Sequence, residues 1–133
     1  MAPAQTSLLA KLDTQQRVRD FLANAIASGR ASHAYLFLGA PGAGKLDAAW
    51  ALAQAFLCEQ DGCGSCDSCV RVARHTHPDV HYYTPDSATG YLIAQTRELL
   101  DDVPLAPIRA KAKVYIIDRA EPVSYTHLRA HET

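Results

Sequence analysis

The sequence predicts an α/β domain in which helices flank a parallel β-sheet. Three observations carry this prediction: short apolar runs typical of buried strands, longer runs with one apolar stripe typical of helices, and a glycine-rich turn that joins a strand to a helix. The chain has 133 residues, which is enough for one domain with a core. Its 48% hydrophobic and 20% charged content is that of an ordinary globular protein.

Three helices are expected from apolar stripes with helical spacing, over residues 15–28, 45–57 and 91–102. Leu46 begins the stripe of the second helix, so we expect it in the core. The stripes comprise Val18, Phe21, Leu22, Ala25 and Ile26 in the first helix, Leu46, Ala49, Trp50, Ala53, Phe56 and Leu57 in the second, and Leu92, Ile93, Thr96, Leu99, Leu100 and Val103 in the third.

Three strands are expected between and after these helices. Residues 35–38 and 114–117 are unbroken apolar runs, which favours strands buried on both faces. Residues 80–84 include His81 and Thr84, and this mixed polarity is typical of an edge strand. The segment His77-Pro78-Asp79 is expected to form the turn that enters it.

Charge and terminal composition exclude several classes. A net charge of −1 gives no argument for electrostatic capture of nucleic acid. The first 13 residues lack the basic start of a secretory signal, and no run reaches the ~18 apolar residues of a membrane span. We therefore expect a cytoplasmic protein with no membrane partner, in which cysteines stay reduced.

The last eleven residues, VSYTHLRAHET, fit poorly with the rest. They back-translate into a string that looks like a sequencing adapter. We expect residues 123–133 to be a translated artefact, and we exclude their histidines from any site.

A phosphate-binding loop is predicted where residues 35–38 lead into the second helix. Glycines let successive N–H groups turn toward one anion, the helix N-terminus adds positive charge, and Lys45 reaches the terminal phosphates. Leu46 departs from the motif, because it replaces the hydroxyl residue that binds Mg²⁺. The expected nucleotide-binding residues here are Gly39, Pro41, Gly42, Ala43, Gly44 and Lys45.

A second acidic motif ends the strand 114–117. Asp118 stands at the position that orients hydrated Mg²⁺ in P-loop proteins, and we include it in the nucleotide site. Arg119 follows it, and a guanidinium cannot serve as a base at neutral pH. Glu121 is two positions beyond the place of a catalytic base. Together with Leu46, Arg119 predicts a cradle that holds ATP weakly, with Mg²⁺ doubtful and no catalytic residue.

Four cysteines predict a structural zinc site. Cys58, Cys63, Cys66 and Cys69 have the spacing C-x4-C-x2-C-x2-C, and four thiolates close a tetrahedron around Zn²⁺. An iron–sulfur cluster is the nearest alternative, although the Cys-Pro that ends ferredoxin runs is absent. Two disulfides would need an oxidising compartment. A nearby histidine is a further candidate ligand, although four cysteines already complete the tetrahedron. The candidates are His75, His77 and His81.

Together these motifs resemble the AAA+ subunits of the bacterial clamp loader within DNA polymerase III. The resemblance covers nearly all of residues 13–121, in SHAYLFLGAPGAGK, the cysteine module, THPDVHYY and IAQTRELLDDVPLAPIRAKAKVYIIDRAE. Such ATPases usually carry a glutamate where Arg119 stands. Leu46, Arg119 and the His-Pro-Asp segment look more like δ′, the stator subunit, than like the ATP-hydrolysing γ/τ subunits, which remain the alternative. A zinc-stabilised nucleotide sensor outside replication is a further alternative.

The resemblance implies a domain plan and a set of partners. Residues 1–12 would be an extension, residues 13–122 part of an AAA+ domain with the zinc module at 58–69, and the C-terminal remainder would be missing. The implied partners are γ/τ and δ in a hetero-oligomer, with the sliding clamp and primed DNA contacted indirectly.

The sheet order implied by the resemblance is 5-1-4-3-2. The strands expected here are the first three, so the slot between strands 1 and 3 would lack strand 4. Unpaired backbone groups cost about 1–3 kcal/mol each when buried. We therefore expect the isolated 133-residue polypeptide not to fold stably.

Overall fold

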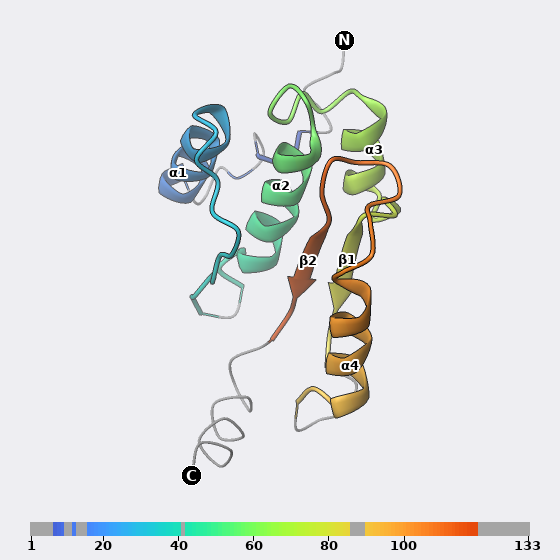
Figure 1. Cartoon of the computed structure of the whole chain (residues 1–133). Helices are drawn as coiled ribbons and strands as arrows, with labels where there is room; N and C mark the ends of the chain where they lie inside the picture. The colour runs from blue at the N-terminus through green and yellow to red at the C-terminus, as the bar shows by residue number, and fades with distance from the viewer. Residues whose placement is uncertain (1–6, 10–11, 13–15, 41, 86–89, 120–133) are drawn as a thin grey trace.

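The computed structural model describes residues 7–9, 12, 16–40, 42–85 and 90–119. Within them lie four helices and two strands, with α2 between α1 and the sheet (Figure 1). The predicted helices and the second and third predicted strands are confirmed to within two residues at each end. The elements are α1 (Gln16–Ala27), α2 (Lys45–Leu57), α3 (Asp67–Ala73), β1 (Val80–Tyr83), α4 (Ile93–Asp102) and β2 (Val114–Ile117).

The two strands pair in parallel, as the order 5-1-4-3-2 predicts for strands 2 and 3. Val80 lies opposite Val114 and Tyr83 opposite Ile117. Val80, Val114 and Ile116 pack on the α2 side of the sheet, and the crossover between the strands runs through α4.

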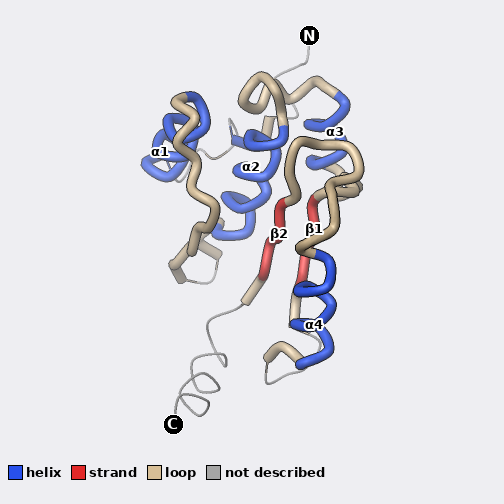
Figure 2. The backbone as a smooth tube through the Cα atoms, in the orientation of Figure 1, coloured by secondary structure: helices blue, strands red, loops and turns tan. Residues whose placement is uncertain are grey.

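The predicted strand at residues 35–38 is wrong: this segment is an extended loop (Figure 2). A strand is defined by a hydrogen-bonded neighbour, and within the described residues neither β1 nor β2 pairs with this segment. Leu36 and Leu38 are consequently 74% and 72% exposed. Tyr35 and Phe37 point the other way and pack against the core of α1 and α2.

The core consists of two apolar clusters on opposite sides of α2. Its alanines Ala48, Ala51 and Ala55 are buried beneath α1, where small side chains let the two helices approach closely. On the other side, Trp50 and Leu57 are buried together with Val72 of α3 and Ile116 of β2.

Phe21 of the α1 stripe is 64% exposed, so its expected place on the apolar face is wrong. Two further sets of apolar residues are also less buried than their spacing predicts. Leu46 is 36% exposed, so its expected place in the core is wrong; it lines the open space between residues 35–37 and β2. None of the residues of α4 is buried, and Ile93 and Leu100 are 68% and 61% exposed. In both cases the described chain brings no layer against the apolar side.

Several expectations fall outside the described residues. These are the artefact assigned to residues 123–133, most of the extension at residues 1–12, Pro41 of the phosphate loop, and Glu121.

Candidate functional site

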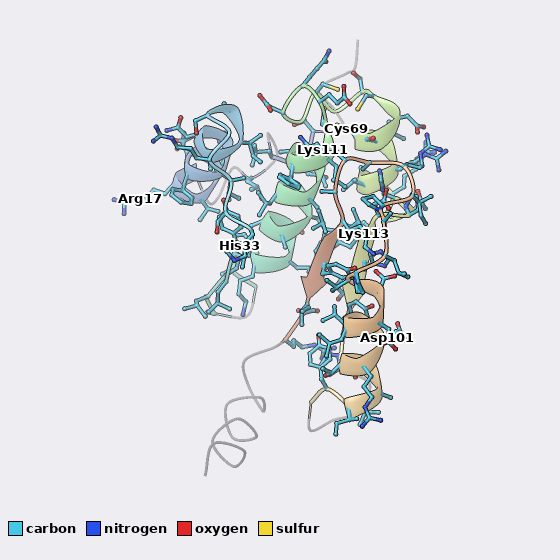
Figure 3. All side chains as sticks on the ribbon, in the orientation of Figure 1. Arg17, His33, Cys69, Asp101, Lys111 and Lys113 are labelled. Atoms are coloured by element: carbon cyan, nitrogen blue, oxygen red, sulfur yellow. The ribbon has the colours of Figure 1, made fainter. Side chains whose placement is uncertain are left out.

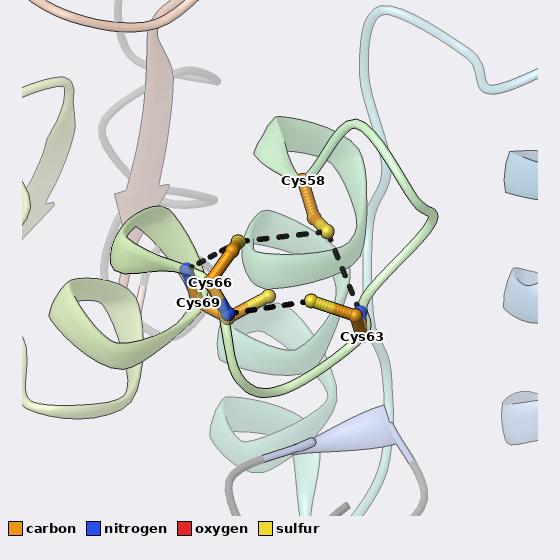
Figure 4. A group of neighbouring side chains, drawn as sticks. All are labelled: Cys58, Cys63, Cys66 and Cys69. Carbon is orange, nitrogen blue, oxygen red and sulfur yellow. Dashed lines mark hydrogen bonds between the residues drawn. The ribbon is translucent and has the colours of Figure 1, made fainter. Parts of the chain in front are cut away.

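The four cysteines converge in a loop between α2 and α3 (Figure 4). Their Sγ atoms all lie within 4.8 Å of one another, and those of Cys58 and Cys66 are 3.8 Å apart. Cys58 follows the last residue of α2, and Cys69 lies in the first turn of α3. All four cysteines are free thiols. The cluster offers four sulfur ligands, so it could hold one metal ion.

Backbone N–H groups around the cluster favour thiolates. Those of Gln60 and Cys63 donate to Cys58 Sγ at 3.2 and 3.4 Å, and those of Ser65 and Cys66 donate to Cys63 Sγ at 3.4 Å each. The Ser65 N–H, followed by its hydroxyl and the Cys66 N–H, lowers the pKa of Cys63 to about 6. Thiolates are the form of cysteine that binds metals.

Burial opposes ionisation at the other three thiols and changes the balance that sets their pKa values. At Cys58, burial opposes ionisation, but the N–H donors outweigh it and the pKa is lowered. Burial raises the pKa values of Cys66 and Cys69, because it removes water from the thiolate, and the neighbouring Cys58 side chain raises both further. A divalent cation would supply the missing charge.

The cysteine module is fastened to α2 by a buried amide. Gln54 is 1% exposed; its Oε1 accepts from Leu8 N at 2.8 Å and its Nε2 donates to Cys69 O at 2.9 Å. Gly62 has φ +99°, and a Cβ on it would lie 3.3 Å from Ala55 Cα. Only glycine therefore lets this turn lie so close to the helix.

The described residues of the predicted phosphate loop form a glycine turn at the start of α2. Gly42 and Gly44 adopt φ values of +82° and +93°, and Gly44 is the residue before the first turn of α2. The aliphatic stem of Lys45 lies over Gly39, since a Cβ added there would be 3.7 Å from Lys45 Cγ. The loop thus curls back toward the lysine at the helix N-terminus.

A groove of about 670 Å³ brings this lysine together with the end of β2. Lys45, Leu46, Asp118 and Arg119 all line it, whereas the described residues of the glycine turn do not. Two of the predicted nucleotide-binding residues therefore share one space with Leu46 and Arg119. The sequence analysis did not consider Asp47, an exposed carboxylate in the first turn of α2. Its negative charge opposes the binding of an anion at this helix end.

Asp118 is engaged by the neighbouring strand. Its Oδ2 accepts from the Tyr82 hydroxyl at 2.8 Å, and its backbone N–H donates to Tyr83 O at 2.9 Å. Arg119 has φ +52°; its guanidinium donates to Thr84 Oγ1 at 2.6 Å and places Nε 3.9 Å from Asp118 Oδ2. Tyr82 reaches Asp118 through the register of the β1–β2 pair, so no local sequence pattern indicates this contact.

Asp79 was predicted only as part of a turn, but it organises the loop that enters β2. It is fully buried, and its carboxylate accepts from the backbone N–H groups of Ile108, Arg109 and Ala110 at 2.6, 2.7 and 2.7 Å. Burial opposes the charge, but these three donors leave the pKa of Asp79 lowered. A carboxylate directly before the predicted edge strand was the available signal.

The same loop reaches the cysteine module. Arg109 donates to Asp67 Oδ2 at 2.7 Å, and Asp67 also pairs with Arg71 at 2.9 Å. Cys69 and Lys111 both lie near the end of α2 opposite its phosphate loop (Figure 3). The structure therefore separates two candidate sites: the four-cysteine cluster at one end of α2 and the glycine turn with Lys45 at the other.

The histidines take other places in the described structure. The His75 ring stacks on Trp50 with centroids 3.8 Å apart, and His81 stacks on Tyr115 at 5.0 Å. His77 Nδ1 accepts from Asp79 N at 3.0 Å and so supports the turn. No helix in the described part of the chain has the length and apolar character needed to cross a membrane.

Comparison with known proteins places the chain in a family. The profile described as "DNA polymerase III, delta subunit" matches residues 14–127. The chain is 39% identical to DNA polymerase III subunit delta′ of Bacillus subtilis over 84% of its length and 35% of the relative. It is also 39% identical to subunit tau of Escherichia coli and 36% identical to subunit gamma/tau of Mycobacterium tuberculosis, over 17% and 20% of those proteins.

The chain thus spans about a third or less of the length of these relatives. The match nevertheless includes the phosphate loop, the cysteine module and the strand that ends in Asp118. The chain belongs to the DNA polymerase III delta subunit family.

Proposed function

We propose that the protein is a δ′-type subunit of a bacterial clamp loader, a scaffolding component with little or no ATPase activity of its own. In this role it assembles with γ/τ and δ in the cytoplasm, and it contributes indirectly to loading the sliding clamp onto primed DNA. The observation that carries the proposal is the groove in which Leu46 and Arg119 stand beside Lys45 and Asp118.

Leu46 and Arg119 each replace a motif residue that ATP hydrolysis requires. Leu46 has no oxygen to offer Mg²⁺, the ion that neutralises charge on the transferring phosphoryl group. Arg119 cannot activate water. The glycine turn and Lys45 still form an anion cradle, so weak binding of ATP is compatible with loss of its cleavage.

The cysteine cluster is proposed to hold structural Zn²⁺. A tetrahedron with Zn–S bonds of about 2.3 Å has S···S edges of roughly 3.8 Å. The separation of Cys58 and Cys66 Sγ is 3.8 Å, and all pairs fall within 4.8 Å. The bound ion would stabilise a module that has almost no core of its own. All four positions are protein sulfurs, so no position is left for a catalytic water.

The alternative is an ATP-hydrolysing γ/τ-type subunit. The equal identity to a delta′ and a tau relative, 39% in each case, favours neither. Leu46 and Arg119 support the proposed δ′ assignment, because a motor subunit needs the hydroxyl and the carboxylate that they replace.

The test is ATP turnover by the full-length gene product. We expect phosphate release at the level of the Lys45→Ala variant, and no further loss on Asp118→Asn. The matched variant is Leu46→Thr combined with Arg119→Glu, which restores both missing groups and should raise turnover if only these groups are lacking. Brisk hydrolysis by the unaltered protein that Asp118→Asn abolishes would overturn the proposal in favour of a motor subunit.

A further inference from the structure

The sheet register brings Tyr82 and Asp118 together. Tyr82 lies opposite Ile116, and Asp118 is two residues further along, so both side chains lie on the face of the sheet that meets α2. The Tyr82 hydroxyl therefore points along the strand toward the carboxylate, and it donates to Oδ2 at 2.8 Å.

The ring of Tyr82 is held in place from the side of α2. Its centroid lies 5.9 Å from that of Trp50, which is buried and is itself stacked on His75. The Tyr82 ring is tilted by 37° from the Trp50 indole and is 41% exposed, so this contact restricts the ring from one side only.

The main chain of Asp118 is fixed as well. Its N–H donates to Tyr83 O, and its carbonyl oxygen accepts from the Tyr91 hydroxyl, which also donates to Tyr83 O at 2.9 Å. The residues after β2 are therefore joined to those after β1. The carboxylate cannot leave Tyr82 by a movement of its own backbone unless these bonds break.

Magnesium does not fit this arrangement. Leu46 supplies no oxygen ligand, and one acceptor position of Asp118 is already taken by a hydroxyl of the protein. A hydrated cation needs the carboxylate as an acceptor for the protons of its bound water, so at Oδ2 it competes with the Tyr82 hydroxyl. The Arg119 Nε, 3.9 Å from the same oxygen, adds a positive charge that opposes the cation.

We propose that Tyr82 is a positioning residue that converts Asp118 from a metal-orienting group into a structural acceptor closing the end of the β1–β2 pair. The consequence is nucleotide binding that does not depend on Mg²⁺. This inference rests on the proposed cradle for ATP. It goes beyond the replacement of motif residues by Leu46 and Arg119, because Tyr82 belongs to neither the phosphate loop nor the acidic motif.

The test compares Tyr82→Phe with Tyr83→Phe in the full-length gene product. Tyr83 is the matched control, because its side chain lies on the opposite face and only its backbone carbonyl takes part in the network. ATP affinity is measured by calorimetry in EDTA and in Mg²⁺. For the wild type and Tyr83→Phe we expect the two affinities to agree within about twofold.

For Tyr82→Phe we expect Mg²⁺ to strengthen ATP binding about fivefold, the effect of removing one competing hydrogen bond. Adding Asp118→Asn to Tyr82→Phe should remove that gain. An unchanged response to Mg²⁺ in Tyr82→Phe, or a strong response in the wild type that Asp118→Asn abolishes, would overturn the inference while leaving the cradle intact.

A second measurement needs no nucleotide. The tyrosine Cζ resonances of ¹³C-labelled protein report the pKa of Tyr82, which burial and, secondarily, the bond to Asp118 raise. In Asp118→Asn this pKa should fall, and an unchanged value would contradict the assignment. If ATP fails to bind the wild type even in EDTA, the proposed cradle is wrong, and this titration still decides whether Tyr82 engages Asp118.

Discussion

The carboxylate of Asp79 accepts the backbone N–H of Ile108 at 2.6 Å, although the two residues are 29 positions apart. Two further N–H groups of the same loop donate to this carboxylate, so a fully buried charge is balanced by backbone alone. The arrangement fixes the direction in which the chain enters β2.

We predict that Asp79→Asn lowers the free energy of unfolding by about 2–3 kcal/mol, because the amide presents a donor to N–H groups that need an acceptor. Urea denaturation of the full-length gene product measures the change. Asp101→Asn on the exposed face of α4 is the control and should change stability by no more than about 0.5 kcal/mol. Equal effects in the two variants would show that the Asp79 contacts add little.

Asp79 also predicts a pH dependence. Its pKa is lowered from an ordinary value of 3.8, so its stabilisation is complete above that value and disappears as the pH falls through the lower folded-state pKa. The stability difference between wild type and Asp79→Asn should therefore shrink below about pH 4. Denaturation of both proteins from pH 6 to pH 3 measures it. Loss of metal at low pH affects both and cancels, and a difference that stays constant would contradict the prediction.

Metal removal should loosen α3 before the rest of the domain. Cys66 precedes this helix and its Sγ accepts from Cys69 N at 3.4 Å, so the metal site and the helix start share atoms. We predict one Zn²⁺ per chain by elemental analysis, and faster amide exchange in residues 67–73 after chelation.

Cys66→Ser tests the same site genetically. It should weaken zinc binding by at least tenfold, because it removes a sulfur that binds the ion directly. A residue that only hydrogen-bonds to a ligand should have a smaller effect. Ser65→Ala, which removes only a 3.6 Å hydroxyl contact to Cys63, should retain the ion. Iron and a visible absorption band in the purified protein would indicate a cluster in place of zinc.

The turn at Gly62 gives a prediction with an internal control. Gly62→Ala introduces a Cβ 3.3 Å from Ala55 Cα, in addition to the strain of a positive φ. Gly29→Ala meets the same kind of strain, with φ +72°, but has nothing within 4 Å. We expect Gly62→Ala to cost about 1–3 kcal/mol more than Gly29→Ala in thermal unfolding. Equal destabilisation by the two substitutions would mean that α2 and the turn move apart without a free-energy cost when the Cβ is added.

The elements that the sequence predicted correctly are those whose signal is local. The stripe of α1 and the apolar run of β2 are properties of their own residues, and both appear where expected. Residues 35–38 have an equally strong run, but a strand also needs a neighbour to pair with, which periodicity cannot supply. The short helix α3 was missed because its start is set by Cys66 and not by an apolar stripe.

The candidate sites divide in the same way. The cysteine cluster was predictable because its spacing alone brings four sulfurs together, and the glycine turn because positive φ values are encoded in single residues. The contacts of Asp79 and Tyr82 span 29 to 36 positions, and each depends on the register of a parallel pair. No local pattern in one sequence carries that information.

The chain contains one tryptophan, and its indole lies between His75, just beyond α3, and Tyr82, which contacts Asp118. Its emission, at longer wavelengths than that of tyrosine, consequently reports on the packing between the segment that follows α3 and strand β1, without an added label.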